Sequence, residues 1–144
     1  MPTRTARTAW NGTLQDGSGQ VELTSSKVGT FDVNFPKRAA DDAGGTTSPE
    51  ELIAAAHAAC FAMSLSNEIG KAGGTPQALD VSAAVTLGQK DGAPHITGIK
   101  LTVRGRVEGL DAAGFEEAAQ EAKAGCPVSK ALAGVDITLD AALG

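Results

Sequence analysis

The amino-acid sequence predicts an α+β fold formed by one domain over residues 1–144. Three observations lead to this class. Stretches that alternate polar and apolar residues, as strands do, lie in the first third and in the middle of the chain. A long apolar helical pattern separates them, and an amphipathic helical pattern precedes a last strand. The expected order is βββ-α-ββ-α-α-β, and 144 residues suffice to bury one core.

The first third predicts an antiparallel meander. Strand-like segments cover residues 4–14, 20–25 and 29–35. Glycine-rich turns at residues 16–19 and 27–29 separate them, because glycine tolerates the backbone angles of tight turns. A polar loop over residues 36–47 then leads to the central helix.

The central helix is expected over residues 48–73. Ser48 suits the N-cap, Pro49 suits the first helical position, and Ser48 with Glu51 has the spacing of a capping box. Apolar residues surround this helix on almost every side, which predicts a buried helix. Most of them are alanines, and small side chains let a second helix approach closely.

The second half predicts a hairpin, two helices and a final strand. The hairpin joins residues 79–89 to residues 95–108 through an Asp-Gly turn. An amphipathic helix follows over residues 112–123, then a short helix from Cys126 to Leu132. The last strand covers residues 135–143, and we expect the central helix to pack against antiparallel sheets.

Composition excludes some classes of protein. The net charge is −5, the arginines and lysines are scattered, and aromatic residues make up 3% of the chain, which argues against a nucleic-acid binder. No uninterrupted apolar run reaches the length of a membrane span, and no apolar segment follows the N-terminal arginines as in a secretory signal. We therefore expect a cytoplasmic protein with reduced cysteines.

The two cysteines, Cys60 and Cys126, are the main candidates for chemistry. Cys60 lies within the central helix, and its reactive thiolate would need a positive charge supplied from elsewhere. Cys126 lies at the start of the short helix, where the helix dipole lowers a thiol pKa. The alternative interpretation is two unrelated buried thiols that act as small hydrophobic residues.

His57 and the glutamates have more than one interpretation. His57 precedes Cys60 by three residues and could act as its base, but a buried histidine bonded to a neighbouring strand or partner chain explains it equally well. Glu51 has the capping position, which leaves Glu50 free for another role. The chain has no ligand cluster typical of zinc, no Gly-x-Ser-x-Gly elbow and no glycine-rich phosphate loop.

Two long motifs resemble the OsmC branch of the OsmC/Ohr peroxidases, the osmotically inducible and organic hydroperoxide resistance proteins. They are TSPEELIAAAHAACF at residues 47–61 and KAGCPVSK at residues 123–130. The resemblance covers essentially the whole chain. It implies a thiol peroxidase without metal, flavin or haem, acting on organic hydroperoxides with a dithiol reductant of the lipoyl type.

The resemblance also implies roles for four residues. Cys60 matches the peroxidatic cysteine, Cys126 the resolving cysteine, and Glu50 the catalytic carboxylate. Arg38 is the candidate for the arginine that stabilises the thiolate, although an ungapped match places Asn34 at that position. The implied fold is an interwoven α+β homodimer with its central helices inside.

A homodimer agrees with the spacing of Glu50 and Cys60. They are ten positions apart, or about 15 Å along a continuous helix, so they cannot meet within one chain. An antiparallel second copy, with a two-fold axis near Ala55, would place Glu50 of one copy opposite Cys60 of the other.

Two other functions remain open at this point. The same disulfide could serve a redox sensor that changes its binding partner, or the chain could form a non-catalytic dimer that binds a small molecule or a protein. The scattered basic residues make a DNA-binding sensor the weaker form of the first alternative.

Overall fold

The computed structural model describes residues 1–144, and the internal contacts of the chain divide it into two units. The first unit is Met1–Leu52 and the second is Ile53–Gly144. The architecture is α+β, with one three-stranded sheet in each unit, as the sequence predicts. The single-domain organisation remains a prediction.

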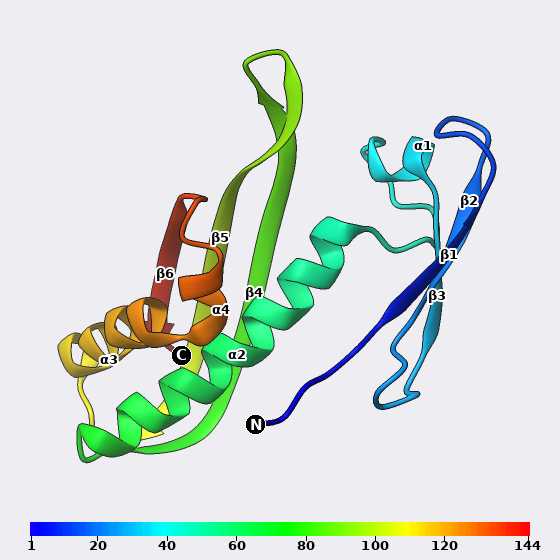
Figure 1. The fold of residues 1–144 in the computed structure, drawn as a ribbon. Coiled ribbons are helices and arrows are strands. Elements are labelled where there is room, and N and C mark those ends of the chain that lie inside the picture. The colour runs from blue at the N-terminus through cyan, green and yellow to red at the C-terminus, as the bar shows by residue number, and fades with distance from the viewer. The chain divides into compact units, whose positions relative to one another are not determined.

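The sheet of the first unit is the expected antiparallel meander. Its strands are β1 (Arg7–Asn11), β2 (Ser18–Glu22) and β3 (Thr30–Val33), paired in the order β1-β2-β3 (Figure 1). Strands β1 and β3 are shorter than their alternating segments, whereas β2 begins at Ser18, within the turn expected at residues 16–19.

A short helix, α1 (Phe35–Arg38), lies where the sequence predicts only a polar loop. Asn34 is its N-cap, and the Asn34 side chain accepts a hydrogen bond from the backbone N–H of Lys37 at 2.8 Å. Pro36 fits the first turn, where a missing N–H costs nothing. The order of elements is therefore βββ-α-α-ββ-α-α-β.

The central helix is α2 (Pro49–Lys71), and its caps largely follow the prediction. The hydroxyl of Ser48 accepts a hydrogen bond from the N–H of Glu51 at 3.1 Å, but the Glu51 carboxylate accepts one from the hydroxyl of Thr47 at 2.7 Å. The capping box is thus only half formed. At the other end Gly73 has φ +90°, a backbone conformation that favours glycine.

The sheet of the second unit consists of β4 (Thr75–Lys90), β5 (Ala93–Glu108) and β6 (Ile137–Leu143). Strands β4 and β5 form the predicted hairpin, which turns at residues 91–92 and extends beyond β6 (Figure 1). Asp91 and Gly92 both have positive φ, as a tight hairpin turn requires.

Strand β6 pairs parallel to β5, so the expectation of purely antiparallel sheets is wrong for this unit. The chain between them contains α3 (Ala112–Gly125) and α4 (Pro127–Ala131). This helical crossover brings the chain back toward the end of the sheet at which β5 starts, so β6 runs in the same direction as β5. Asp111 caps α3 by accepting a hydrogen bond from the N–H of Gly114 at 2.8 Å.

The core of the second unit lies between α2, α3 and the sheet. One row of α2 side chains, spaced four residues apart, faces this core and is fully buried. Strand β5 contributes two buried side chains, and α3 contributes the face that its amphipathic pattern predicts. The buried cluster consists of Phe61, Leu65, Ile69, Leu101, Val103, Phe115, Ala118, Ala119 and Ala122.

Other faces of α2 remain uncovered within one chain, contrary to the prediction of a helix buried on all sides. Ala55, Ala56 and Ala59 are exposed, and Met63 is 73% exposed. Helix α2 is also long and apolar enough on average to cross a membrane, although polar residues such as His57 and Ser64 interrupt its apolar run. Core helices of soluble proteins meet the same criterion, so this property alone does not identify a membrane protein.

Candidate active site

The two cysteines, 66 residues apart in sequence, are in contact in the second unit. The Sγ atoms of Cys60 and Cys126 are 2.7 Å apart, with Cys126 as the donor of a hydrogen bond, and both are free thiols. Cys126 is fully buried, whereas Cys60 is partly exposed. A disulfide has an S–S distance of about 2.05 Å, so the pair needs only a small movement, together with an oxidant that removes two electrons and two protons, to form one.

Backbone hydrogen bonds fix Cys126 at the junction of two helices. Its N–H donates to the carbonyl of Ala122 at 2.9 Å and so ends α3. Its carbonyl accepts from the N–H of Lys130 at 3.0 Å and so begins α4. Pro127 occupies the first position of α4, where its fixed φ suits the helix. The sulfur is therefore held by a rigid segment.

The environment shifts the two thiol pKa values in opposite directions. Burial raises the pKa of Cys60, and contact with Cys126 raises it further. Only the backbone of Val128 and the hydroxyl of Ser64 act against this, and neither is a cation. Burial also acts to raise the pKa of Cys126, but its hydrogen bonds with Cys60, Ser129 and Val128 outweigh burial and lower this pKa.

The raised pKa of Cys60 differs from the expectation for a peroxidatic cysteine, whose thiolate must form at neutral pH. It agrees with the sequence argument that the helix of Cys60 supplies no positive charge and that a cation must come from elsewhere.

His57 is fully buried beside the cysteine pair, and its partner is a serine. Its Nε2 lies 2.7 Å from Oγ of Ser129 in α4, and its Nδ1 has no hydrogen-bond partner. Burial lowers the pKa of His57, so the ring is neutral at physiological pH. Of the two interpretations, the buried and hydrogen-bonded histidine agrees with the structure. The partner lies on a helix, where we expected a strand or a second chain.

The other two predicted residues, Arg38 and Glu50, form an ion pair in the first unit. Nε of Arg38 donates to Oε1 of Glu50 at 2.8 Å, and Nη2 donates to Oε2 at 2.9 Å. Glu50 is only 6% exposed. The hydrogen bond to Glu50 is the main reason that the pKa of Arg38 is raised. Asn34 instead caps α1, so Arg38 is the residue that meets the glutamate.

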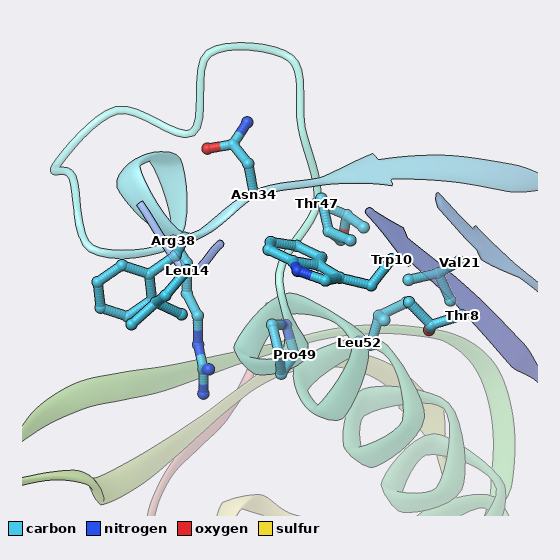
Figure 2. Close-up of a pocket in the computed structure, with 11 residues that line it drawn as sticks. Thr8, Trp10, Leu14, Val21, Asn34, Arg38, Thr47, Pro49 and Leu52 are labelled. Carbon is cyan, nitrogen blue, oxygen red and sulfur yellow. The ribbon is translucent and has the colours of Figure 1, made fainter. Parts of the chain in front are cut away.

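An open, mainly apolar pocket of about 450 Å³ lies in the first unit, and the sequence analysis did not predict it. Figure 2 shows the Trp10 indole near Pro49 and Leu52 at the start of α2, with the Arg38 side chain nearby. The signal that could have indicated it is Trp10, a large aromatic residue on a short strand that leaves it 41% exposed. The lining consists of Thr8, Trp10, Leu14, Val21, Val33, Asn34, Phe35, Arg38, Thr47, Pro49 and Leu52.

The four predicted residues thus form two pairs, Arg38 with Glu50 in one unit and Cys60 with Cys126 in the other. A bidentate arginine can orient an anion or a polar substrate, and two adjacent thiols can form a reversible disulfide. No group of three or more His, Cys, Asp or Glu side chains is arranged to hold a metal ion.

The α+β fold and the adjacent thiols of Cys60 and Cys126 occur together in a chain of a known protein family. Residues 41–140 match the model of the family described as OsmC-like protein, and the chain belongs to this family. It is 44% identical over 131 residues, 91% of this chain and 90% of the relative, to the protein of Escherichia coli (strain K12) named peroxiredoxin OsmC. It is 33% identical, over 83% of this chain and 85% of the relative, to the organic hydroperoxide resistance protein OhrA of Bacillus subtilis (strain 168).

A solved structure has the same fold. The organic hydroperoxide resistance protein OhrB of Bacillus subtilis superposes with a TM-score of 0.75 at 30% sequence identity, covering 95% of this chain and 97% of that protein. The names of these relatives support a role in peroxide reduction or hydroperoxide resistance, and the resemblance of the two motifs is confirmed at the level of the family.

Proposed function

We propose that this protein is a cysteine-based peroxidase that reduces organic hydroperoxides, and hydrogen peroxide more slowly, to alcohols or water. The observation that carries the proposal is the contact between the free thiols of Cys60 and Cys126, with 2.7 Å between their sulfurs. Cytoplasmic conditions would keep both thiols reduced between turnovers.

In the first step the Cys60 thiolate attacks the outer oxygen of the hydroperoxide. The O–O bond breaks, the sulfur gains oxygen and becomes a sulfenic acid, and the alkoxide takes a proton to leave as an alcohol. Cys60 suits this step better than Cys126, because Cys60 is partly exposed whereas Cys126 is fully buried.

In the second step Cys126 attacks the sulfenic sulfur of Cys60. The S–O bond breaks, water leaves, and a Cys60–Cys126 disulfide forms. A dithiol of the lipoyl type then reduces this disulfide by thiol–disulfide exchange and becomes oxidised itself. The chain needs no metal, flavin or haem for these steps.

The cation that the Cys60 thiolate needs would come from a second copy of the chain. Two α2 helices can cross closely because Ala55, Ala56 and Ala59 are small and exposed. With a two-fold axis near Ala55, the Arg38–Glu50 pair of one copy would serve Cys60 of the other. Within one chain only 22% of an apolar 18-residue stretch of α2 is buried. A homodimer would cover more of this stretch.

The apolar pocket near Arg38 supports a preference for organic hydroperoxides. Its volume of about 450 Å³ suits an apolar tail, and burying such a tail contributes about 25 cal/mol per Å². Hydrogen peroxide has no tail and gains nothing from this surface.

The test compares cumene hydroperoxide, linoleic acid hydroperoxide and hydrogen peroxide as substrates with dihydrolipoamide as reductant. We expect the two organic substrates to give the higher kcat/KM. We also expect one equivalent of peroxide to remove both thiols together when free thiols are counted. If the two thiols are not lost together, the disulfide mechanism is wrong, and a disulfide that forms but is not recycled by dihydrolipoamide would favour a redox sensor.

A further inference from the structure

We propose that His57 and Ser129 are positioning residues for the resolving step, which polarise the Cys126 sulfur and hold it against Cys60. This inference rests on the proposed peroxidase function for its kinetic meaning. The feature that carries it is a pair of parallel links between α2 and the start of α4, both buried in the second unit.

The two links have matching spacing. His57 and Cys60 are three residues apart on α2, and Cys126 and Ser129 are three residues apart at the start of α4. The Nε2–Oγ distance of the first link and the Sγ–Sγ distance of the second are both 2.7 Å. His57 is fully buried and Ser129 is 6% exposed, so water does not compete for their hydrogen bond. This bond fixes the segment that carries Cys126.

The unpartnered Nδ1 of His57 indicates the direction of the hydrogen bonds. If the hydrogen were on Nδ1, a buried N–H group would have no acceptor. If the hydrogen is on Nε2, Nδ1 carries only a lone pair without a donor. Orphaned buried N–H groups are rarer than orphaned acceptors, so the hydrogen belongs on Nε2. Nε2–H of His57 then donates to Oγ of Ser129, and the Ser129 hydroxyl hydrogen is free to point to Cys126.

This arrangement favours the Cys126 thiolate. The hydroxyl and the backbone N–H of Ser129 both lower the pKa of Cys126, and a hydroxyl that accepts from His57 is a stronger donor. In the resolving step the thiolate electron pair forms the S–S bond as the S–O bond of the Cys60 sulfenic acid breaks. The hydroxide that leaves takes up the proton that the Cys126 thiol has released, and water results.

The first test measures the pKa of Cys126 alone, in a Cys60→Ser background, from the ultraviolet absorbance of its thiolate. We expect Ser129→Ala to raise this pKa by about one unit, as loss of a hydrogen bond to a charged group does. Ser129→Thr keeps the hydroxyl and should restore the parent value. Ser82→Ala, at an exposed position of β4, is the matched control.

The histidine is tested in the same background. His57→Leu should raise the Cys126 pKa in the same direction as Ser129→Ala. His57→Gln can place an amide N–H near the position of Nε2, and it should recover part of the shift. A Cys126 pKa that is the same in the parent, Ser129→Ala and His57→Leu proteins would overturn the proposal.

The second test separates the two half-reactions in a single turnover with both cysteines present. Ser129→Ala should slow disulfide formation about threefold to tenfold. A higher Cys126 pKa reduces the fraction of Cys126 present as thiolate, and the greater nucleophilicity of that thiolate compensates only in part. The rate at which peroxide oxidises Cys60 should stay unchanged. Equal slowing of both steps would mean a general structural defect and would contradict the positioning role. If the pKa shifts occur but no peroxide is reduced, the proposed function fails while the hydrogen-bonded link stands.

Discussion

Arg38 and Glu50 are joined by two hydrogen bonds, Nε to Oε1 at 2.8 Å and Nη2 to Oε2 at 2.9 Å. The pair uses two of the five N–H donors of the guanidinium and fixes its plane. The remaining donors are available to an anion. Lysine cannot reproduce this arrangement, because an ammonium group has no planar fork.

We predict that Arg38→Ala slows the oxidation of Cys60 by an organic hydroperoxide about tenfold or more, since the loss of the cation raises the pKa of the thiol. Arg38→Lys should recover only part of the rate. The measurement is the second-order rate constant of the first oxidation. Arg104→Ala, which removes an exposed ion pair with Asp140, is the control and should react like the parent. An unchanged rate for Arg38→Ala would mean that another cation serves Cys60.

The two cysteine variants should fail in different ways. Cys60→Ser should abolish peroxide consumption, because the remaining thiol, Cys126, is fully buried. Cys126→Ser should still allow one oxidation of Cys60 but leave it as sulfenic acid, which excess peroxide drives to sulfinic acid. Mass spectrometry of the intact protein after peroxide treatment distinguishes these products. Full turnover by Cys60→Ser would refute the mechanism.

The buried His57 should make the protein less stable in mild acid. Its pKa is lowered by burial, so between about pH 6.5 and the lower folded-state pKa the unfolded chain binds a proton that the folded chain does not. Above about pH 6.5 both states are neutral and the histidine makes no pH-dependent contribution. As the pH falls through this window, the free energy of unfolding therefore decreases.

Urea unfolding across this pH range measures the effect. The His57→Gln protein should lose part of the pH dependence, since glutamine does not titrate. His95 lies exposed on β5, and His95→Gln is the control that should keep the slope of the parent. Identical slopes for the parent and the His57→Gln protein would show that folding does not shift the pKa of His57.

The exposed alanines of α2 provide a test of the homodimer. Ala55→Leu places a bulky side chain near the proposed two-fold axis, and we expect it to weaken dimerisation and lower peroxidase activity. Sedimentation velocity measures the assembly. Ala113→Leu, at an exposed position of α3, is a matched control that should leave the dimer intact. A parent protein that is monomeric and fully active would exclude the shared site.

Phe115 should be a major contributor to the stability of the second unit. Its side chain is 1% exposed and packs in the cluster formed by α2, α3 and β5. We expect Phe115→Ala to lower the free energy of unfolding by about 3–5 kcal/mol. The control is Phe31→Ala in the first unit, where the ring is 40% exposed and the loss should be much smaller. Urea denaturation of both variants provides the comparison.

Most elements of the fold follow from local patterns in the sequence. The predicted cap Ser48 and the Asp-Gly turn at residues 91–92 mark a helix start and a hairpin turn correctly. Asp111, which the structure shows to be a cap, lies directly before the expected start of the amphipathic helix. Helix α1 was missed because its Asn34 cap continues the alternating pattern of a strand, and Pro36 begins a polar stretch that is also typical of a loop. The parallel direction of β6 is not visible in its own alternation, because it depends on the crossover through α3 and α4.

The site could be predicted only in part. The sequence places Cys60 on a helix and Cys126 at a helix start, but their contact is a tertiary relationship across 66 residues, and only the family resemblance suggested it. The choice between Asn34 and Arg38 depended on the path of one loop. The bond between His57 and Ser129 left no local signal, since either residue alone is compatible with many surroundings. The catalytic roles of Cys60, Cys126, Glu50 and Arg38 remain predictions.

The position of Trp10 gives this protein an internal optical probe. Trp10 lines the apolar pocket, and the chain contains one tryptophan and no tyrosine. Nearly all intrinsic fluorescence excited above the phenylalanine band must therefore originate from this one ring. An apolar molecule that enters the pocket would displace water from the indole and change its emission, so occupancy can be followed in the unlabelled native protein.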